Sequence, residues 1–246
     1  MYAAVILCIL VVAASASPEK FIFGNKLDQP APEKCCAEPY YTFQADSVFN
    51  TLQEGSLLTE LIRARGAYDS IDKKFGLKVD LHISNGTVEL YQLINDFKEG
   101  LGYYIYTEEE ETKCVEFPIT SGFPYNCIPE GSTYVGSVTI GDRALRAANW
   151  YFNDKTDPTK DMHIVFSIKE EECIDLGYLA RTFDPETGTE ISVDRTGISD
   201  YNLGICDPDT YFKPPEECKS AKVKRVNSVP KRIGGLRGPR GQRLFQ

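Results

Sequence analysis

The sequence predicts an all-β domain, and three observations indicate it. Residues 77–83 alternate between apolar and polar side chains, which is typical of a half-buried strand. The Asn85-Gly86 pair that follows is a strong signal for a tight hairpin turn. Further short apolar runs recur with turn residues between them, without a strand–helix–strand alternation. We therefore expect antiparallel sheets in a sandwich or barrel.

The expected strands combine short length with apolar or aromatic side chains, and they cover 77–83, 88–97, 101–106, 134–140, 145–152, 162–168, 174–183 and 190–193. One helix is predicted over Leu57–Arg65. Alternation places Val79 and Leu81 on the apolar face of one strand, and Ile164 and Phe166 on that of another. These four side chains are predicted to point into the interior of the sheet. The only two histidines, His82 and His163, have the opposite parity and are expected at the surface.

The N-terminal segment predicts secretion. Residues 3–12 are almost wholly apolar, and Ala14-Ser15-Ala16 resembles a cleavage site, although no Lys or Arg precedes the apolar run. This run is shorter than a bilayer-spanning helix requires. We expect a signal peptide over 1–16, an extended leader over 17–34, a β domain over 35–218 and a basic, disordered tail over 219–246.

Charge is divided unequally along the chain. The tail 219–246 carries nine Lys and Arg and no acids, so the body, with 18 basic and 36 acidic residues, has a net charge of −18. An acidic body repels nucleic acid, which we exclude as a partner. The Lys-Arg pairs of the tail fit either processing sites or a patch that binds sulfated glycans.

The sequence contains no catalytic motif. It has no Gly-x-Ser-x-Gly elbow, no His-Glu-x-x-His and no Cys-x-x-Cys, so we expect neither an enzyme nor a required cofactor. Acidic runs such as Glu108–Glu111 lack the spacing of an EF-hand, and calcium would bind only through acids that the fold brings together. Asn85-Gly86-Thr87 is a glycosylation sequon at an expected hairpin tip, which predicts a glycan on Asn85.

Several short patterns, in order, resemble the ependymin-related family. They are Cys36-Ala37-Glu38-Pro39, Tyr68-Asp69, Phe97-Lys98-Glu99-Gly100, Asn149-Trp150, a strand ending at Cys173, and Leu203 to Cys218 with its Gly-Ile-Cys-Asp-Pro and Pro-Pro elements. The resemblance implies two stacked, curved antiparallel sheets around a hydrophobic pocket, which Val79, Leu81, Ile164 and Phe166 would line. It also implies secretion, a homodimer, and an association with calcium and the cell–matrix contact.

The resemblance further implies a pattern of disulfides. Seven cysteines remain after the signal peptide, and an oxidising compartment favours their pairing. The family pattern pairs Cys36 with Cys173 and Cys114 with Cys218. Cys127 and Cys206 depart from the family, and a bond between them is the simplest use of two additional cysteines. Cys35 is then unpaired or joins two chains.

Two functions follow as hypotheses. The first is a secreted glycoprotein that binds a hydrophobic, lipid-like ligand in a pocket of the β-sheet. The second is an acidic extracellular-matrix or adhesion glycoprotein that acts through surface charge, glycan and calcium. Lipid that co-purifies with the protein would favour the first hypothesis, and calcium-dependent self-association would favour the second.

Overall fold

The computed structural model describes residues 30–53, 55–124, 126–140, 145–153, 159–167, 173–219 and 223–227. The chain divides into the units Met1–Pro30 and Ala31–Gln246. The predicted signal peptide and the leader as far as residue 29 lie outside the described residues, as do residues 228–246 of the predicted tail.

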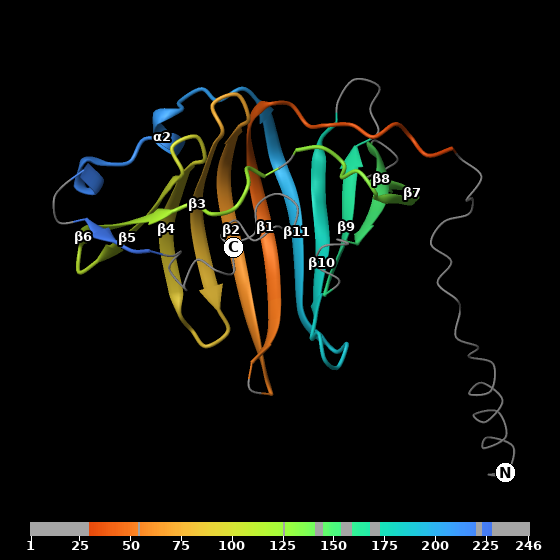
Figure 1. Cartoon of the computed structure of the whole chain (residues 1–246), viewed down its shortest axis with the longest axis horizontal. Coiled ribbons are helices and arrows are strands. Elements are labelled where there is room, and N and C mark those ends of the chain that lie inside the picture. Colours follow the sequence, from red (N-terminus) through yellow and green to blue (C-terminus); the bar gives the residue numbers. More distant parts are fainter. Residues whose placement is uncertain are drawn as a thin grey trace, which may run out of the picture. The chain divides into compact units, whose positions relative to one another are not determined.

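The described part of the second unit is a twelve-stranded sheet with two short helices, which confirms the all-β prediction (Figure 1). The strands are β1 (Tyr40–Gln53), β2 (Ser56–Asp69), β3 (Lys74–Ile83), β4 (Val88–Asp96), β5 (Leu101–Glu108), β6 (Glu111–Pro118), β7 (Thr133–Ile140), β8 (Leu145–Asn153), β9 (Lys160–Ser167), β10 (Asp175–Phe183), β11 (Glu190–Leu203) and β12 (Lys224–Arg225). The helices are α2 (Asp209–Phe212) and the 3₁₀ helix η1 (Glu216–Lys219).

The hydrogen-bond ladder joins all these strands into one sheet rather than into two separate ladders. Their order is β12-β6-β5-β4-β3-β2-β1-β11-β10-β9-β8-β7. Every pair is antiparallel except β12 with β6. Most neighbours are consecutive in sequence and need only a hairpin, whereas β1 pairs with β11 and so joins the two ends of the domain at the centre of the sheet.

The helix predicted over Leu57–Arg65 is wrong, because these residues belong to β2. From Leu61 to Gly66 the side chains alternate between exposed and buried. Leucine, alanine and arginine favour helices in isolation, but β2 is paired along its length with β1 and β3, and this pairing overrides the local preference.

One face of the sheet carries most of the buried side chains, and we call it the inner face. On β2 it carries Ile62 and Ala64, and in the paired register it continues to Leu81 and Val79 of β3. Close packing on this face requires glycine at position 102, where a Cβ atom would lie 2.3 Å from the ring of Phe117. The Tyr68 hydroxyl donates to the carbonyl oxygen of Pro124, in the segment between β6 and β7, at 2.8 Å, so this segment lies on the inner face. The segment crosses in front of β1–β3 in Figure 1, which therefore looks onto the inner face.

The disulfides are Cys35–Cys173, Cys36–Cys127 and Cys114–Cys218. The third is the pairing that the resemblance implies, but the other two predicted bonds are wrong. Adjacent residues of an extended segment point to opposite sides, so Cys35 and Cys36 reach different partners. Cys36 forms an isolated β-bridge with Cys127, while Cys35 packs with Cys173 beside β8–β10. The free cysteine among the described residues is the exposed Cys206, not Cys35.

The segment after Cys218 is not disordered as far as the structure describes it. Lys219 ends η1, and Lys224 and Arg225 form β12 at the edge of the sheet beside β6. The guanidinium Nε of Arg225 lies 3.1 Å from a carboxylate oxygen of Glu116. The prediction of disorder from residue 219 is therefore wrong for these residues.

Candidate functional site

Two apolar clusters occupy the inner face. The larger one lies on β1–β6 and includes Tyr41, Phe43, Ile62, Ala64, Tyr68, Phe75, Leu77, Val79, Leu81, Tyr91, Leu93, Tyr104, Val115 and Phe117. The smaller one lies on β8–β10 and includes Ala148, Trp150, Met162, Ile164, Phe166, Tyr178 and Ala180. Aromatic rings contribute much of the surface in both clusters, as in sites that bind apolar ligands.

The four residues predicted to line a pocket are all buried on this face, but they do not form one group. Val79 and Leu81, 4% and 5% exposed, belong to the larger cluster. Ile164 and Phe166, both 0% exposed, belong to the smaller one. A lining role for them remains a prediction.

A polar group on β1, β10 and β11 separates the two clusters. Ser47 Oγ donates to the buried carboxylate of Asp194 at 2.7 Å, and the Thr196 hydroxyl donates to the same oxygen at 3.1 Å. The Tyr178 hydroxyl donates to the second carboxylate oxygen at 3.3 Å. We call these four residues the central polar group.

Sequence reasoning missed the central polar group because polar alternation normally predicts a solvent-facing side. Ser192, Asp194 and Thr196 alternate along β11, and all three are buried in the structure. This alternation indicates buried polar side chains only once β11 is known to lie in the middle of the sheet, between β1 and β10.

Two further carboxylates lie on the inner face, on Glu60 of β2 and Glu89 of β4. In the register, Glu60 faces Ile83 of β3 and Phe49 of β1, and Glu89 faces Leu81. Burial raises the pKa of Glu60 above its ordinary value, and the carboxylates of Glu89 and Asp194 raise it further. This part of the inner face therefore has a negative potential inside an apolar surround.

One end of the inner face is covered by the segment between β6 and β7. The Phe123 ring packs on Tyr68 and Phe97, with ring centroids 5.0 and 5.1 Å apart. The Cys36–Cys127 bond and the hydrogen bond from Asn126 Nδ2 to the carbonyl oxygen of Ala37, at 2.6 Å, hold this segment to the start of the domain. The apolar surface is thereby closed on one side.

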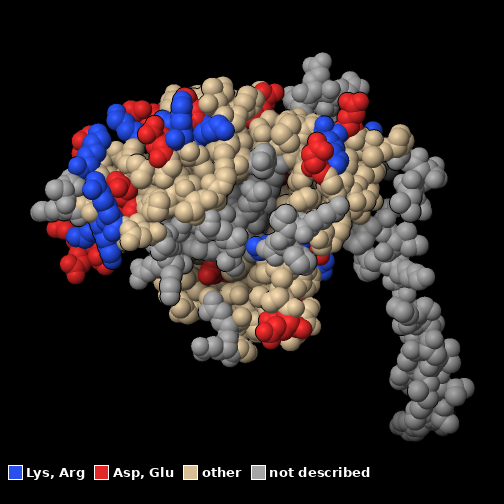
Figure 2. Space-filling view, in the orientation of Figure 1, with Lys and Arg blue, Asp and Glu red and all other residues tan. Residues whose placement is uncertain are grey.

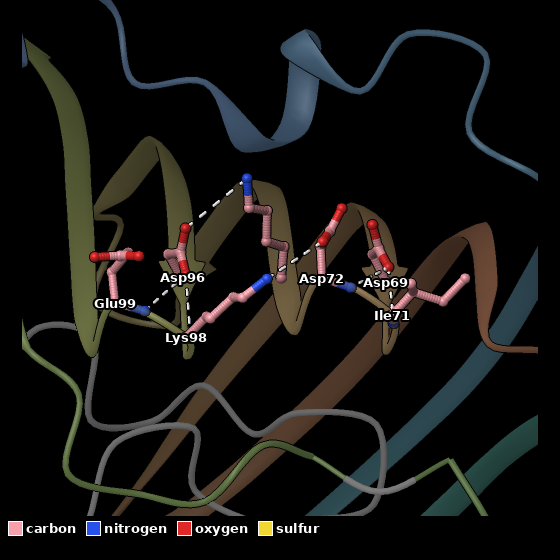
Figure 3. Close-up of polar contacts among 7 residues, drawn as sticks. Asp69, Ile71, Asp72, Asp96, Lys98 and Glu99 are labelled. Carbon is pink, nitrogen blue, oxygen red and sulfur yellow. Dashed lines mark hydrogen bonds and ion pairs between the residues drawn. The ribbon is translucent and has the colours of Figure 1, made fainter.

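A separate cavity of about 660 Å³ lies at the turns between β2 and β3 and between β4 and β5, beneath α2. Figure 3 shows these turns, which Asp69 and Asp96 shape by accepting backbone N–H bonds from Ile71 and Asp72 and from Lys98 and Glu99. Lys74 and Lys98 pair across the turns with Asp96 and Asp72, each at 3.8 Å. The charged side chains here bond within and between the two turns. None of the four predicted pocket residues lines this cavity.

The glycosylation sequon and the acidic run 108–111 of the sequence lie at the surface. Asn85 is exposed in the turn between β3 and β4, where its side-chain oxygen accepts the N–H of Thr87 at 2.9 Å, and its glycosylation remains a prediction. Glu111, in the acidic run 108–111, pairs with Lys113. Within the described ranges no three His, Cys, Asp or Glu residues are grouped as a metal site, so calcium binding also remains a prediction.

Charged side chains of both signs gather over the part of the sheet that carries β6, β12 and α2, as Figure 2 shows. None of the helices in the described part of the chain is both long and apolar enough to span a bilayer. The three disulfides are typical of a protein from an oxidising, extracellular environment.

Comparison of the chain with known proteins identifies its family. The chain is 24% identical over 176 residues to the development-specific protein LVN1.2 of Lytechinus variegatus, covering 68% of this chain and 90% of that protein. A DUF1329 family protein of Desulfovibrio piger matches in structure over 71% of this chain and 90% of its own, at 11% identity and a TM-score of 0.23. The ependymin family model matches residues 85–218, over half of the sequence, and the chain therefore belongs to the ependymin family.

Proposed function

We propose that this protein is a secreted, non-enzymatic glycoprotein that holds an apolar, lipid-like ligand against the inner face of its sheet. The observation that carries the proposal is the arrangement of that face. Two aromatic-rich clusters flank four converging polar side chains, Ser47, Tyr178, Asp194 and Thr196. Small-molecule sites typically combine an apolar wall with a few placed polar groups in this way.

The clusters would supply affinity and the polar group would supply orientation. Each methylene removed from water contributes about 0.8 kcal/mol, so a long acyl chain gains enough to offset its ordering cost. A hydroxyl or amide of the ligand would exchange hydrogen bonds with the central polar group. An anionic head group is disfavoured because Glu60, Glu89 and Asp194 make the same face negative.

A second candidate function is an acidic matrix or adhesion glycoprotein associated with calcium. The net charge of −18 in the body favours it, since dense acids attract cations and keep the chain soluble. It predicts self-association that appears when calcium is added and disappears when calcium is chelated. Analytical ultracentrifugation of the glycosylated full chain measures this directly.

A substitution on the inner face tests the first candidate. Ile83 is half-buried at the margin of the larger cluster, beside Glu60, so Ile83→Trp would fill space there without forcing bulk into the packed core. We expect the affinity for an uncharged, long-chain fluorescent alcohol to fall about tenfold or more, which is about 1.4 kcal/mol. The matched control is Leu61→Trp, one strand away on the opposite face and 51% exposed.

The control should leave the affinity unchanged, and both variants should unfold at similar urea concentrations. Equal affinity in the wild-type chain and Ile83→Trp would place the ligand elsewhere. No saturable binding in any variant, together with no lipid in native mass spectrometry of the secreted protein, would contradict the proposal and favour the matrix function.

A further inference from the structure

We propose that the C-terminal segment, residues 228–246, binds across the inner face of its own chain and competes there with the apolar ligand. The proposal uses the face to which the proposed function assigns the ligand. Three features of the chain support it: where the described residues end, how far the remaining residues reach, and which charges they carry.

The described chain ends on the inner side of the sheet edge. β12 pairs with β6 in parallel, with Lys224 opposite Val115 and Arg225 opposite Glu116. The N–H of Val226 continues this ladder by donating to the carbonyl oxygen of Glu116 at 3.0 Å. The Val226 side chain packs against the larger apolar cluster. Val226 therefore holds the chain beside the inner face, and Asn227 is the last described residue.

The remaining chain is long enough to cross the sheet. Nineteen residues follow Asn227 in the sequence. An extended chain advances about 3.3 Å per residue, so they span up to roughly 60 Å. From β6 to β2 is four strand spacings, and to β11 six, which corresponds to about 19 and 29 Å. Glu60 and Asp194 also lie eight residues, or about 27 Å, along the strands from the level of Val226. The direct distances are therefore about 33 and 40 Å, which an extended segment reaches.

The chemistry of the segment complements that of the inner face. The segment contains Lys231, Arg232, Arg237, Arg240 and Arg243, no acids, and apolar residues that include Ile233, Leu236, Leu244 and Phe245. The inner face carries the half-buried carboxylate of Glu60 between aromatic clusters, and the carboxylates of Glu89 and Asp194 add to the negative potential there. Arginine pairs well with carboxylates in such surroundings because a guanidinium donates in a planar fork and is weakly hydrated.

The opposite face of the central strands is less suitable. It carries Arg63 and Arg65 on β2, paired in the register with Asp80 and Lys78 of β3. Arg63 already binds Asp46 at 2.9 Å. On β2 and β3 this face carries Arg63, Arg65 and Lys78 against Asp80, so a basic segment would meet an excess of like charge. The inner face of the same region carries the acids Glu60 and Glu89. Charge thus selects one face of the sheet.

The consequence is a built-in competitor for ligand. A segment that is covalently attached acts at a high effective concentration, so weak contacts suffice to occupy the site. Cleavage after the Lys231-Arg232 pair would remove Leu236, Leu244 and Phe245 together with three arginines, and would leave the face open to ligand. Processing would then raise ligand affinity without altering the domain.

Photo-crosslinking of the full chain tests the location. We would replace Phe245 with benzoylphenylalanine and map adducts by mass spectrometry, mixing isotope-labelled and unlabelled chains. We expect adducts within one chain, on inner-face residues of β1–β4 or β11, with a yield that falls severalfold between 50 mM and 1 M salt. Adducts on the outer face, between chains only, or independent of salt would overturn the proposal, as would no adduct.

Charge reversal tests the competition. In the full chain, Lys231→Glu/Arg232→Glu should raise the affinity for the uncharged fluorescent alcohol at least threefold and reduce the Phe245 crosslink. Lys213→Glu/Lys219→Glu changes the net charge equally, at exposed positions that pair with Asp209 and Glu216, and should do neither. Equal effects of the two pairs would overturn the proposal. If the alcohol binds no variant, the proposed function fails, and the crosslink alone decides where the segment lies.

Discussion

At the scale of single residues, the position of a polar side chain in the fold determines its chemistry more than its type does. The two histidines illustrate this. His82 is exposed on β3, with Nε2 2.9 Å from an oxygen of Asp80. His163 is half-buried on β9, with its ring 5.1 Å from that of Tyr151. The sequence predicted both histidines at the surface. Only their neighbours in the fold make His163 the more buried of the two.

His163 carries a prediction about pH. Burial lowers the pKa of His163 below 6.5, with a smaller contribution from Arg181 and an opposing one from Asp161. The unfolded chain then binds this proton more readily than the folded one, so stability falls as pH decreases through 6.5. We expect His163→Gln to flatten the pH dependence of the free energy of unfolding between pH 7.5 and 5.5. Urea titrations measure it.

His82→Gln is the matched control, because it removes the other histidine from an exposed position. If the wild-type chain and His163→Gln lost stability in parallel over this range, the burial of His163 would have no energetic weight. The comparison needs no ligand and does not depend on the proposed function.

At the scale of elements, the disulfides fix segments that have little regular structure. The Cys114–Cys218 bond ties η1 to β6, and both sulfurs are buried with Ile94 and Ile105 on the outer face of the sheet. It closes a loop with a sequence separation of 104. In the chain-entropy model, a loop of this length stabilises the folded state by about 4–5 kcal/mol.

Replacing both cysteines of this bond with serine should therefore lower the free energy of unfolding by about 3–5 kcal/mol. The segment from η1 to β12 should also exchange its amide hydrogens faster. Guanidinium titration and hydrogen exchange measure the two effects. Cys206→Ser, which changes an exposed free thiol, is the control and should be near neutral. A small effect with unchanged exchange would show that packing alone holds η1.

Elements with strong alternation were predictable from the sequence, and those with mixed signals were not. β3, with Leu77, Val79 and Leu81 on one side, was predicted nearly to its ends. β1, β2 and β6 were missed or assigned wrongly, because threonine, serine, glutamate and arginine interrupt their apolar pattern. These strands are stabilised by neighbours that are far away in sequence, such as β11 for β1, which no local pattern reveals.

The candidate site was predictable only in part for the same reason. Parity placed Val79, Leu81, Ile164 and Phe166 on apolar faces, and all four are buried. Their division into two clusters follows from β11 and β1 lying between them. The cysteine pairing failed likewise, since the adjacent Cys35 and Cys36 could be assigned only once the bridge between Cys36 and Cys127 was known.

At the scale of the whole molecule, the chain combines an acidic body with a basic C-terminal segment, and their mutual attraction couples two binding events. If ligand and segment compete for the inner face, each must weaken the other by the same factor, because linkage between binding free energies is reciprocal. The threefold or greater gain in ligand affinity expected on charge reversal therefore sets the size of the opposite effect.

That opposite effect is accessibility of the segment to protease. Saturating the full chain with the uncharged alcohol should speed trypsin cleavage after Arg232 and Arg237 by about the same factor of three or more, because the displaced segment offers its backbone to the enzyme. Timed digestion with mass spectrometry measures the rates. Cleavage after Lys34, at the other end of the domain, serves as the internal control and should not change with ligand. A ligand that slowed cleavage of the segment would mean that segment and ligand bind together rather than in competition.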